Sequence, residues 1–214
     1  MRERGFAVAG IVCAAVFAVV TWWVVASGAP PGIDVRIGTF FVEHRTGWAT
    51  AVLRPLTWLG SNALLIPLVI AVGAWFWLRR HDGRPALFMA AALLGADLFG
   101  HLTKALVARE RPPLSVHLAP INSASYPSGH AAQALACWGM VALLVGAGRS
   151  RRTRLALWAA ASAIVAVVAL SRLYLGVHWF TDVVGGLALG GLWLCVLGIA
   201  YVRWGGDEPR PTVP

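Results

Sequence analysis

Three short stretches of this 214-residue sequence concentrate the side chains that could do chemistry. In the last of them, His178 and Asp182 are four residues apart, so on a helix they lie on one face. A carboxylate beside an imidazole fixes the imidazole tautomer and stabilises its charged form, as in a nucleophile or general-base pair. The same spacing also fits an ordinary helix start, with Thr181 or Asp182 as the cap.

The middle stretch, Tyr126-Pro127-Ser128-Gly129-His130, is typical of a tight turn that leads into a helix. Such a turn points backbone N–H groups and the serine hydroxyl toward an anion at the helix N-terminus. The alternative is an ordinary helix start, in which Ser128 is the N-cap and His130 is an interfacial residue.

The first stretch supplies cations. Lys104 is the only lysine in the sequence, and Arg111 follows seven residues later, so the two point to one side if the helix continues for two turns. Pro112-Pro113 then ends any helix. Arg172, near the third stretch, adds another cation.

These cations decide between two kinds of site. His130, His178 and Asp182 could be three metal ligands, but the neighbouring Lys and Arg side chains would crowd a divalent cation with positive charge. Fixed cations with two histidines instead suit a multiply charged oxyanion such as phosphate. We therefore expect neither a metal nor another cofactor.

Membrane-spanning helices must position these residues. Hydrophobic residues make up 58% of the sequence and charged residues 13%, and the mean hydropathy is +0.70. A water-soluble domain of this size cannot bury so much apolar surface. We predict an all-α, six-transmembrane-helix bundle that forms one domain over residues 1–204, with a disordered tail at 205–214. The apolar runs long enough to span a bilayer are residues 6–27, 58–78, 85–103, 131–148, 155–171 and 183–202.

The distribution of basic residues predicts the orientation. With a cytoplasmic N-terminus, 11 of the 18 Lys and Arg residues lie inside, including those of the short turns at 79–84 and 149–154. Both termini are then cytoplasmic, and segments 28–57, 104–130 and 172–182 face outward, the first as a short interfacial helix. The net charge of +9 comes from dispersed clusters without a basic stripe, so no nucleic-acid partner is expected.

Together, the three stretches resemble the motifs of the type 2 phosphatidic acid phosphatase (PAP2) superfamily. They occur in order with no departure at a motif position, and the six-span layout is similar to the bacterial lipid-phosphatase branch. The matching residues are Lys104, six residues, and Arg111-Pro112; Pro127-Ser128-Gly129-His130; and Ser171-Arg172, five residues, His178, three residues, and Asp182.

The resemblance implies a role for each matched residue. His178 would attack phosphorus and form a phosphohistidine, and Asp182 would orient it. His130 would act as general acid on the leaving oxygen and then as base for water. The phosphoryl oxygens would be held by Lys104, Arg111, Arg172, the Ser128 hydroxyl and the Gly129 N–H.

The resemblance also implies a cell-membrane enzyme whose active site faces the periplasm or cell exterior. It would hydrolyse the terminal phosphate of a lipid phosphate or diphosphate, with polyprenyl (undecaprenyl) diphosphate first and phosphatidic acid or phosphatidylglycerol phosphate as alternatives. A phosphotransferase using the same intermediate stays open. A non-catalytic binder or transporter of anionic lipids is disfavoured, because five of the six spans contain almost no ionisable residues.

Three polar residues outside the motifs have open roles. Asp97 and His101 share a helix face with Lys104, so Asp97 either steadies Lys104 or a histidine, or makes a structural hydrogen bond. Arg109 is either a surface charge or a substrate contact.

Overall fold

The computed structural model describes residues 3–119, 121 and 123–204, and in these residues all regular secondary structure is helical. The predicted tail at 205–214 lies outside the described residues. The α-helices are α1 (Glu3–Ser27), α2 (Gly32–Glu43), α3 (Gly47–Leu56), α4 (Asn62–Arg80), α5 (Arg84–Val107), α6 (Gly129–Gly146), α7 (Arg151–Tyr174) and α8 (Phe180–Trp204), with short 3-10 helices η1 (Thr57–Gly60) and η2 (Leu114–Val116).

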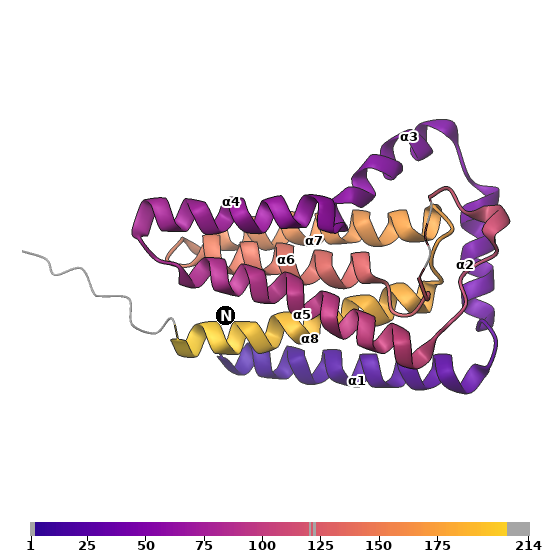
Figure 1. Cartoon of the computed structure of the whole chain (residues 1–214), viewed down its shortest axis with the longest axis horizontal. Helices are drawn as coiled ribbons and strands as arrows, with labels where there is room; N and C mark the ends of the chain where they lie inside the picture. Colours follow the sequence, from indigo (N-terminus) through magenta and orange to yellow (C-terminus); the bar gives the residue numbers. More distant parts are fainter. Residues whose placement is uncertain (1–2, 120, 122, 205–214) are drawn as a thin grey trace, which may run out of the picture.

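Six of these helices, α1 and α4–α8, are long and apolar enough to cross a membrane. They run side by side along the long axis of the molecule, while α2 lies across one end of the bundle (Figure 1). The predicted all-helical class with six spans is therefore confirmed.

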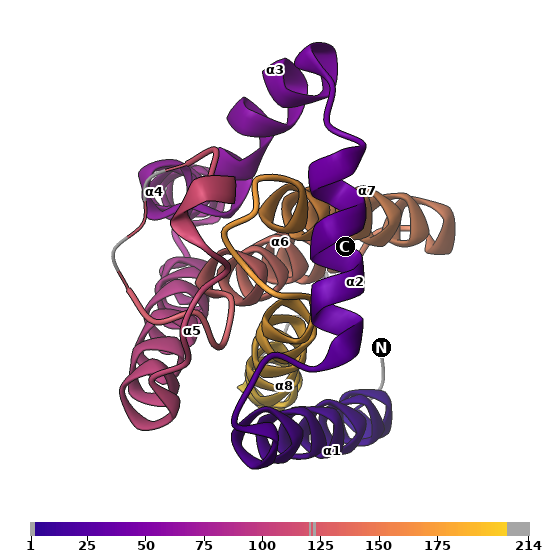
Figure 2. The ribbon, with the colours of Figure 1, turned by 90° about the vertical axis from the view of Figure 1, so that its right-hand side faces the viewer.

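Helix α6 occupies the centre of the bundle and contacts α4, α5, α7 and α8 (Figure 2). Its packing against α8 is unusually close, because glycines of α8 face the backbone of α6. A Cβ atom added at Gly186 would overlap the carbonyl oxygen of Ser128, and one at Gly190 would overlap that of Ala132. The missing side chains thus let the two helix backbones approach each other directly.

Segment 28–57 forms two helices, so the prediction of a single short interfacial helix is wrong. His44 leaves the helical conformation at the end of α2, and the Thr46 hydroxyl caps α3 by accepting from the Ala49 N–H at 3.3 Å. Thr46 is also held against α7, because its backbone N–H donates to the Tyr174 hydroxyl. A threonine N-cap after a helix break starts a new helix.

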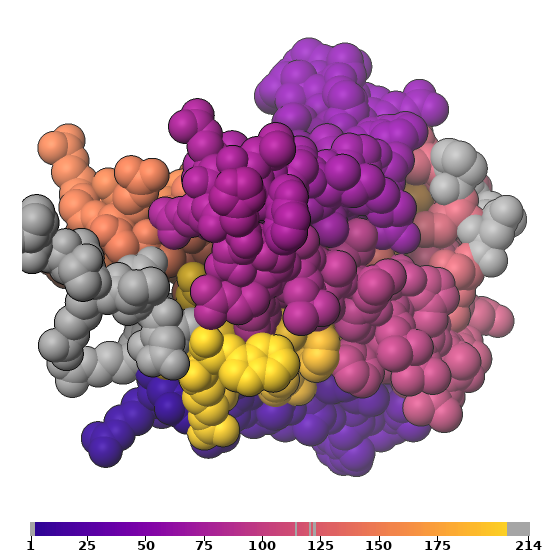
Figure 3. Space-filling view, turned by 60° about the vertical axis from the view of Figure 1, so that its left-hand side comes forward, coloured from indigo at the N-terminus to yellow at the C-terminus, as the bar shows by residue number. Residues whose placement is uncertain are grey.

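The described ends of the chain meet at the end of the bundle opposite α2. Arg203 of α8 pairs with Glu3 of α1, with Nη2 2.5 Å from Oε1. In the space-filling view, the last turn of α8 lies between α1 and α4 at this end (Figure 3). The start of α8, with His178 just before it, is consequently at the α2 end.

Candidate active site

His178 and Asp182 form a buried pair at the start of α8. His178 Nδ1 lies 3.4 Å from Asp182 Oδ2, and both side chains are almost completely inaccessible to solvent. The same carboxylate oxygen accepts from the Trp179 backbone N–H at 2.8 Å and from the Ser125 hydroxyl. Asp182 is not the cap residue itself, because α8 begins at Phe180; it lies in the first turn, where it accepts from the N–H that precedes the helix and also faces the imidazole.

The neighbours of the imidazole determine its tautomer. Nδ1 faces a carboxylate acceptor, whereas Nε2 lies 3.3 Å from Nη1 of Arg111, which is a donor. The proton therefore belongs on Nδ1, and Nε2 carries the lone pair. In this tautomer Nε2 is the nitrogen that can act as a nucleophile.

The surroundings also keep His178 neutral. Burial lowers its pKa well below the ordinary value of 6.5, and the positive charges of Arg111, Arg172 and Lys104 lower it further. Both effects disfavour the imidazolium, so Nε2 remains unprotonated at neutral pH.

The turn before α6 is tied to the same pair. Ser128 is the N-cap residue of α6, and its backbone N–H donates to the Asp182 carbonyl at 2.9 Å. Its hydroxyl makes no capping bond and is buried without a hydrogen-bond partner among the described residues. Gly129 is the first residue of α6, and N–H groups at this position of a helix have no partner within the helix and can bind anions.

His130 stands in the first turn of α6, close enough to interact electrostatically with His178, Arg111, Lys104 and Arg172. The structure thus brings the second predicted histidine to the same cluster of cations as the first.

Lys104 and Arg111 reach the site from different elements. Helix α5 ends at Val107, where Ala108 adopts a left-handed conformation with φ of 48°, so Lys104 and Arg111 do not share one continuous helix. Lys104 Nζ donates to the Ala124 carbonyl at 2.6 Å from the last turn of α5. Arg111 extends from the following loop, where its Nε donates to the Ser123 carbonyl at 2.6 Å and its Nη1 to the Val177 carbonyl.

Arg111 stays charged in this position. Burial lowers its pKa to about 10, and the charge of Asp182 acts in the opposite direction. Because its carbonyl partners are neutral, the guanidinium keeps its positive charge available to an anion.

Arg172 approaches from the last turn of α7 with 2% of its surface exposed. Its Nη1 donates to the Thr57 hydroxyl at 2.9 Å, whereas its Nε has no hydrogen-bond partner among the described residues. An unpaired buried guanidinium nitrogen is costly, and an oxyanion would satisfy it.

The sequence left two roles open for Arg109, a surface charge or a substrate contact. The structure shows a different role. It is neither a surface charge nor aimed at the histidines, but bridges two carboxylates: Nη1 lies 2.5 Å from Asp182 Oδ1 and Nη2 lies 2.7 Å from Asp34 Oδ2. Sequence reasoning missed both Asp34 and Ser125 as partners of the site. No sequence signal distinguished Asp34, because α2 also carries the charged residues Arg36 and Glu43.

Asp97 does not steady Lys104 in this structure. Its Oδ1 accepts from Gln133 Nε2 of α6 at 2.5 Å, and its Oδ2 lies 3.5 Å from His101 Nδ1. This arrangement is the structural hydrogen bond that the sequence left as an alternative.

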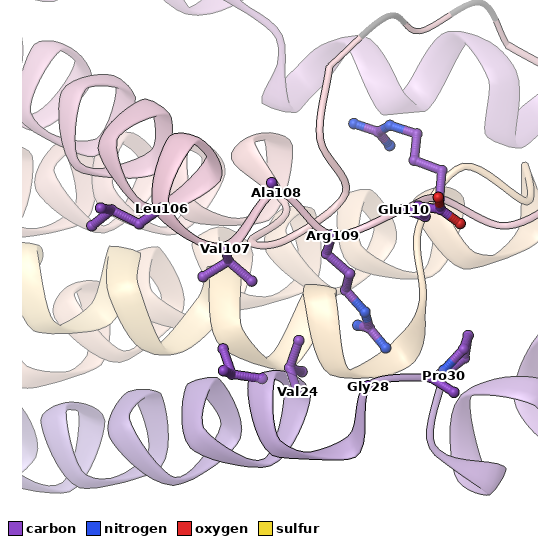
Figure 4. Close-up of a pocket in the computed structure, with 11 residues that line it drawn as sticks. Val24, Gly28, Pro30, Leu106, Val107, Ala108, Arg109 and Glu110 are labelled. Atoms are coloured by element: carbon purple, nitrogen blue, oxygen red, sulfur yellow. The ribbon is translucent and has the colours of Figure 1, made fainter.

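Two openings reach the site. A pocket of about 440 Å³ lies between the ends of α1 and α5, with Val24 and Val107 on its helical walls and Arg109 pointing toward the connection after α1 (Figure 4). Arg111, which contacts His178, also lines this pocket. A second cavity of about 360 Å³ lies against α2 and includes His178 in its wall.

No group of three or more His, Cys, Asp and Glu side chains within residues 3–119, 121 and 123–204 is arranged to hold a metal ion. The described donors are chiefly N–H and O–H groups and positive charges. Such a set can bind a phosphoryl group and stabilise the negative charge that develops on it.

Comparison with known proteins places the chain in a family. Residues 85–205 match the PAP2 superfamily. The chain is 31% identical over 169 residues to phosphatidylglycerophosphatase B of Bacillus subtilis (strain 168), covering 77% of this chain and 81% of that protein. It is 33% identical over 171 residues to decaprenylphosphoryl-5-phosphoribose phosphatase of Mycobacterium tuberculosis (strain CDC 1551 / Oshkosh), covering 77% of this chain and 88% of that protein.

A solved structure agrees with this placement. The crystal structure of a transmembrane PAP2-type phosphatidylglycerolphosphate phosphatase from Bacillus subtilis superposes with a TM-score of 0.83 at 25% identity, over 94% of this chain and 98% of that chain. The fold and these comparisons together define a membrane phosphatase, that is, a phosphoric-ester hydrolase. The chain belongs to the PAP2 superfamily, as its motifs predicted.

Proposed function

We propose that the protein hydrolyses the terminal phosphate of a membrane lipid phosphate through a phosphohistidine on His178. One observation carries this proposal: a neutral buried imidazole whose Nε2 carries the lone pair and faces Arg111 lies among cations, and two buried polar atoms, Ser128 Oγ and Arg172 Nε, have no partner among the described residues. A bound phosphoryl group would satisfy all of them.

The reaction follows in two steps. His178 Nε2 attacks phosphorus, the bond from phosphorus to the lipid oxygen breaks, and His130 donates a proton to that oxygen. Water then attacks the phosphohistidine while His130 takes the proton of the water, which releases inorganic phosphate and restores Nε2. Lys104, Arg111 and Arg172, with the Ser128 hydroxyl and the Gly129 N–H, hold the phosphoryl oxygens.

The pocket between α1 and α5 supports a lipid substrate. It lies between two membrane-spanning helices, and an apolar groove along Phe17, Thr21 and Val25 of α1 continues from it through the shared residue Val25. A lipid could therefore keep its tail against α1 while its phosphate approaches the cations at the pocket wall.

The choice of lipid rests on the relatives. Two of them carry names that refer to phosphatidylglycerol phosphate, and one acts on a decaprenyl-linked phosphate. We place a glycerolipid phosphate such as phosphatidylglycerol phosphate first, and the polyprenyl diphosphate expected from the sequence stays a prediction beside it.

We also propose that the site faces the periplasm or cell exterior and that both termini are cytoplasmic. The support is the excess of arginine at the turns 79–84 and 149–154, which lie at the other end of the bundle from His178.

The test is a panel of lipid phosphates assayed side by side for phosphate release in detergent containing a chelator. The panel includes phosphatidylglycerol phosphate, phosphatidic acid and undecaprenyl diphosphate. We expect turnover by the wild type, a loss of about 10⁴-fold or more in His178→Ala, and near-normal turnover in the control His81→Ala, which changes an exposed histidine after α4, at the opposite end of the bundle. Equal phosphate release by the wild type and His178→Ala across the panel would refute the proposal.

A further inference from the structure

Helix α2 buries a charge where an amphipathic helix usually buries apolar side chains. Asp34 is completely inaccessible to solvent, whereas the other residues of α2 are at least partly exposed. Its Oδ1 accepts from the Thr181 backbone N–H at 2.8 Å, and its Oδ2 accepts from the Thr181 hydroxyl at 2.7 Å. A buried carboxylate with this many donors is held in one orientation.

Arg109 links this carboxylate to the candidate active site. Its side chain is 9% exposed, and its two terminal nitrogens lie against different carboxylates, Nη2 against Asp34 Oδ2 at 2.7 Å and Nη1 against Asp182 Oδ1 at 2.5 Å. Nη1 also donates to the Thr181 hydroxyl at 2.7 Å. A planar guanidinium clamped in this way cannot rotate without breaking an ion pair.

The two carboxylate oxygens of Asp182 have different partners, and this links Arg109 to the orientation of His178. Arg109 holds Oδ1, whereas Oδ2 accepts from Trp179 and Ser125 and faces His178 Nδ1 at 3.4 Å. Because the two oxygens of a carboxylate are rigidly connected, anchoring Oδ1 fixes where Oδ2 points. The orientation of the imidazole therefore depends on a chain of contacts that begins at α2.

We infer that Asp34 is a positioning residue which, through Arg109, sets the geometry of Asp182 and thereby of the His178 nucleophile. The inference rests on the proposed function of His178. It makes α2, a helix outside the six spans, a necessary part of the reaction centre.

The test compares Asp34→Asn with the wild type. Asparagine keeps the size of the side chain and one acceptor oxygen, but it removes the charge that holds Arg109. Asp82→Asn is the matched control, because it makes the same chemical change in the turn between α4 and α5, at the opposite end of the bundle. We expect kcat to fall about 10- to 100-fold in Asp34→Asn, the range typical for removing an outer partner of a reactive group. KM should stay within about twofold, because Asp34 touches no substrate.

A double-mutant cycle separates positioning from general damage to the fold. If Asp34 acts through Asp182, its effect on kcat should shrink to about twofold or less when Asp182→Asn is already present. Single-turnover measurements with enzyme in excess keep the slow variants measurable. A loss of the same factor in both backgrounds would mean that Asp34 acts through the fold alone, and it would overturn the inference.

Arg109→Lys provides a second route should Asp34→Asn fail to fold. Lysine keeps one positive charge but cannot bridge two carboxylates, so the same loss in kcat and the same non-additivity with Asp182→Asn are expected. Wild-type kcat in either variant overturns the inference and leaves the proposed function standing. A wild type without turnover on any lipid phosphate overturns both.

Discussion

The proximity of Arg111 to the imidazole of His178 makes a prediction about pH. Nη1 of Arg111 lies 3.3 Å from Nε2, and after burial its charge is the largest cause that lowers the His178 pKa. Replacing this side chain in Arg111→Met removes a positive charge, which favours the imidazolium, so the pKa of His178 should rise. The neutral nucleophile is then lost at a higher pH than in the wild type.

Coulomb's law sets the size of the change. Two unit charges about 4 Å apart interact by roughly 4 kcal/mol at an effective dielectric constant of about 20. This energy is an upper bound on the change. Burial and the charges of Arg172 and Lys104 persist in the variant. We therefore expect the pKa of His178 to rise, by less than this energy alone would give.

The assay measures kcat/KM for phosphate release between about pH 5 and pH 8, the window in which imidazoles titrate. The ratio of variant to wild type at each pH is the informative quantity, because titration of the substrate phosphate affects both proteins equally. The ratio should decrease toward acid pH. Arg36→Met, which removes an exposed arginine from α2, is the control and should give a constant ratio. If kcat/KM of Arg111→Met and of the wild type decreased in the same way toward acid pH, the claim that Arg111 lowers the pKa of the His178 nucleophile would be refuted.

The remaining predictions concern the acid, the anion site and the topology. His130→Ala should slow an alkyl phosphate more than an activated aryl phosphate, and equal slowing of both would contradict the role of general acid. Ser128→Ala should lower kcat/KM about tenfold. The thermal midpoint of the substrate-free protein should stay unchanged or rise, because the variant removes a buried hydroxyl without a partner among the described residues. A lower midpoint would show that the hydroxyl is structural. In a variant without native cysteines, Glu43→Cys should react with a membrane-impermeant maleimide on intact cells and Arg149→Cys only after lysis, and the reverse pattern would invert the proposed orientation.

The long-range architecture could be predicted from the sequence because each span leaves a strong local signal. About twenty consecutive apolar residues have few alternatives to a bilayer-spanning helix, and the polar motifs all fall in segments on the same side of an alternating path. Even so, the sequence could not settle whether Lys104 and Arg111 share one helix, and they do not, because the chain turns at Ala108, before the prolines. A left-handed alanine has no signature in the sequence.

The partners of the site could not be predicted, since they come from distant parts of the chain. Asp34 and Arg109 are 75 residues apart, and their contact depends on α2 lying across the end of the bundle. The sequence also could not reveal that the Ser128 hydroxyl makes no capping bond, because N-cap serines normally do. The catalytic roles given to His178, His130 and Asp182 stay predictions for the experiments above.

The close approach of α6 and α8 restricts which parts of the molecule can move during turnover. At Gly186 and Gly190 the backbone of α8 contacts the backbone of α6 directly. If these helices slid or separated, they would open a gap that no side chain fills. His130 lies in the first turn of α6, and His178 lies just before α8. The contact between the two helix backbones therefore sets the spacing of the histidines, and a ligand does not adjust it. An incoming headgroup must therefore fit the histidine spacing that the substrate-free protein already has.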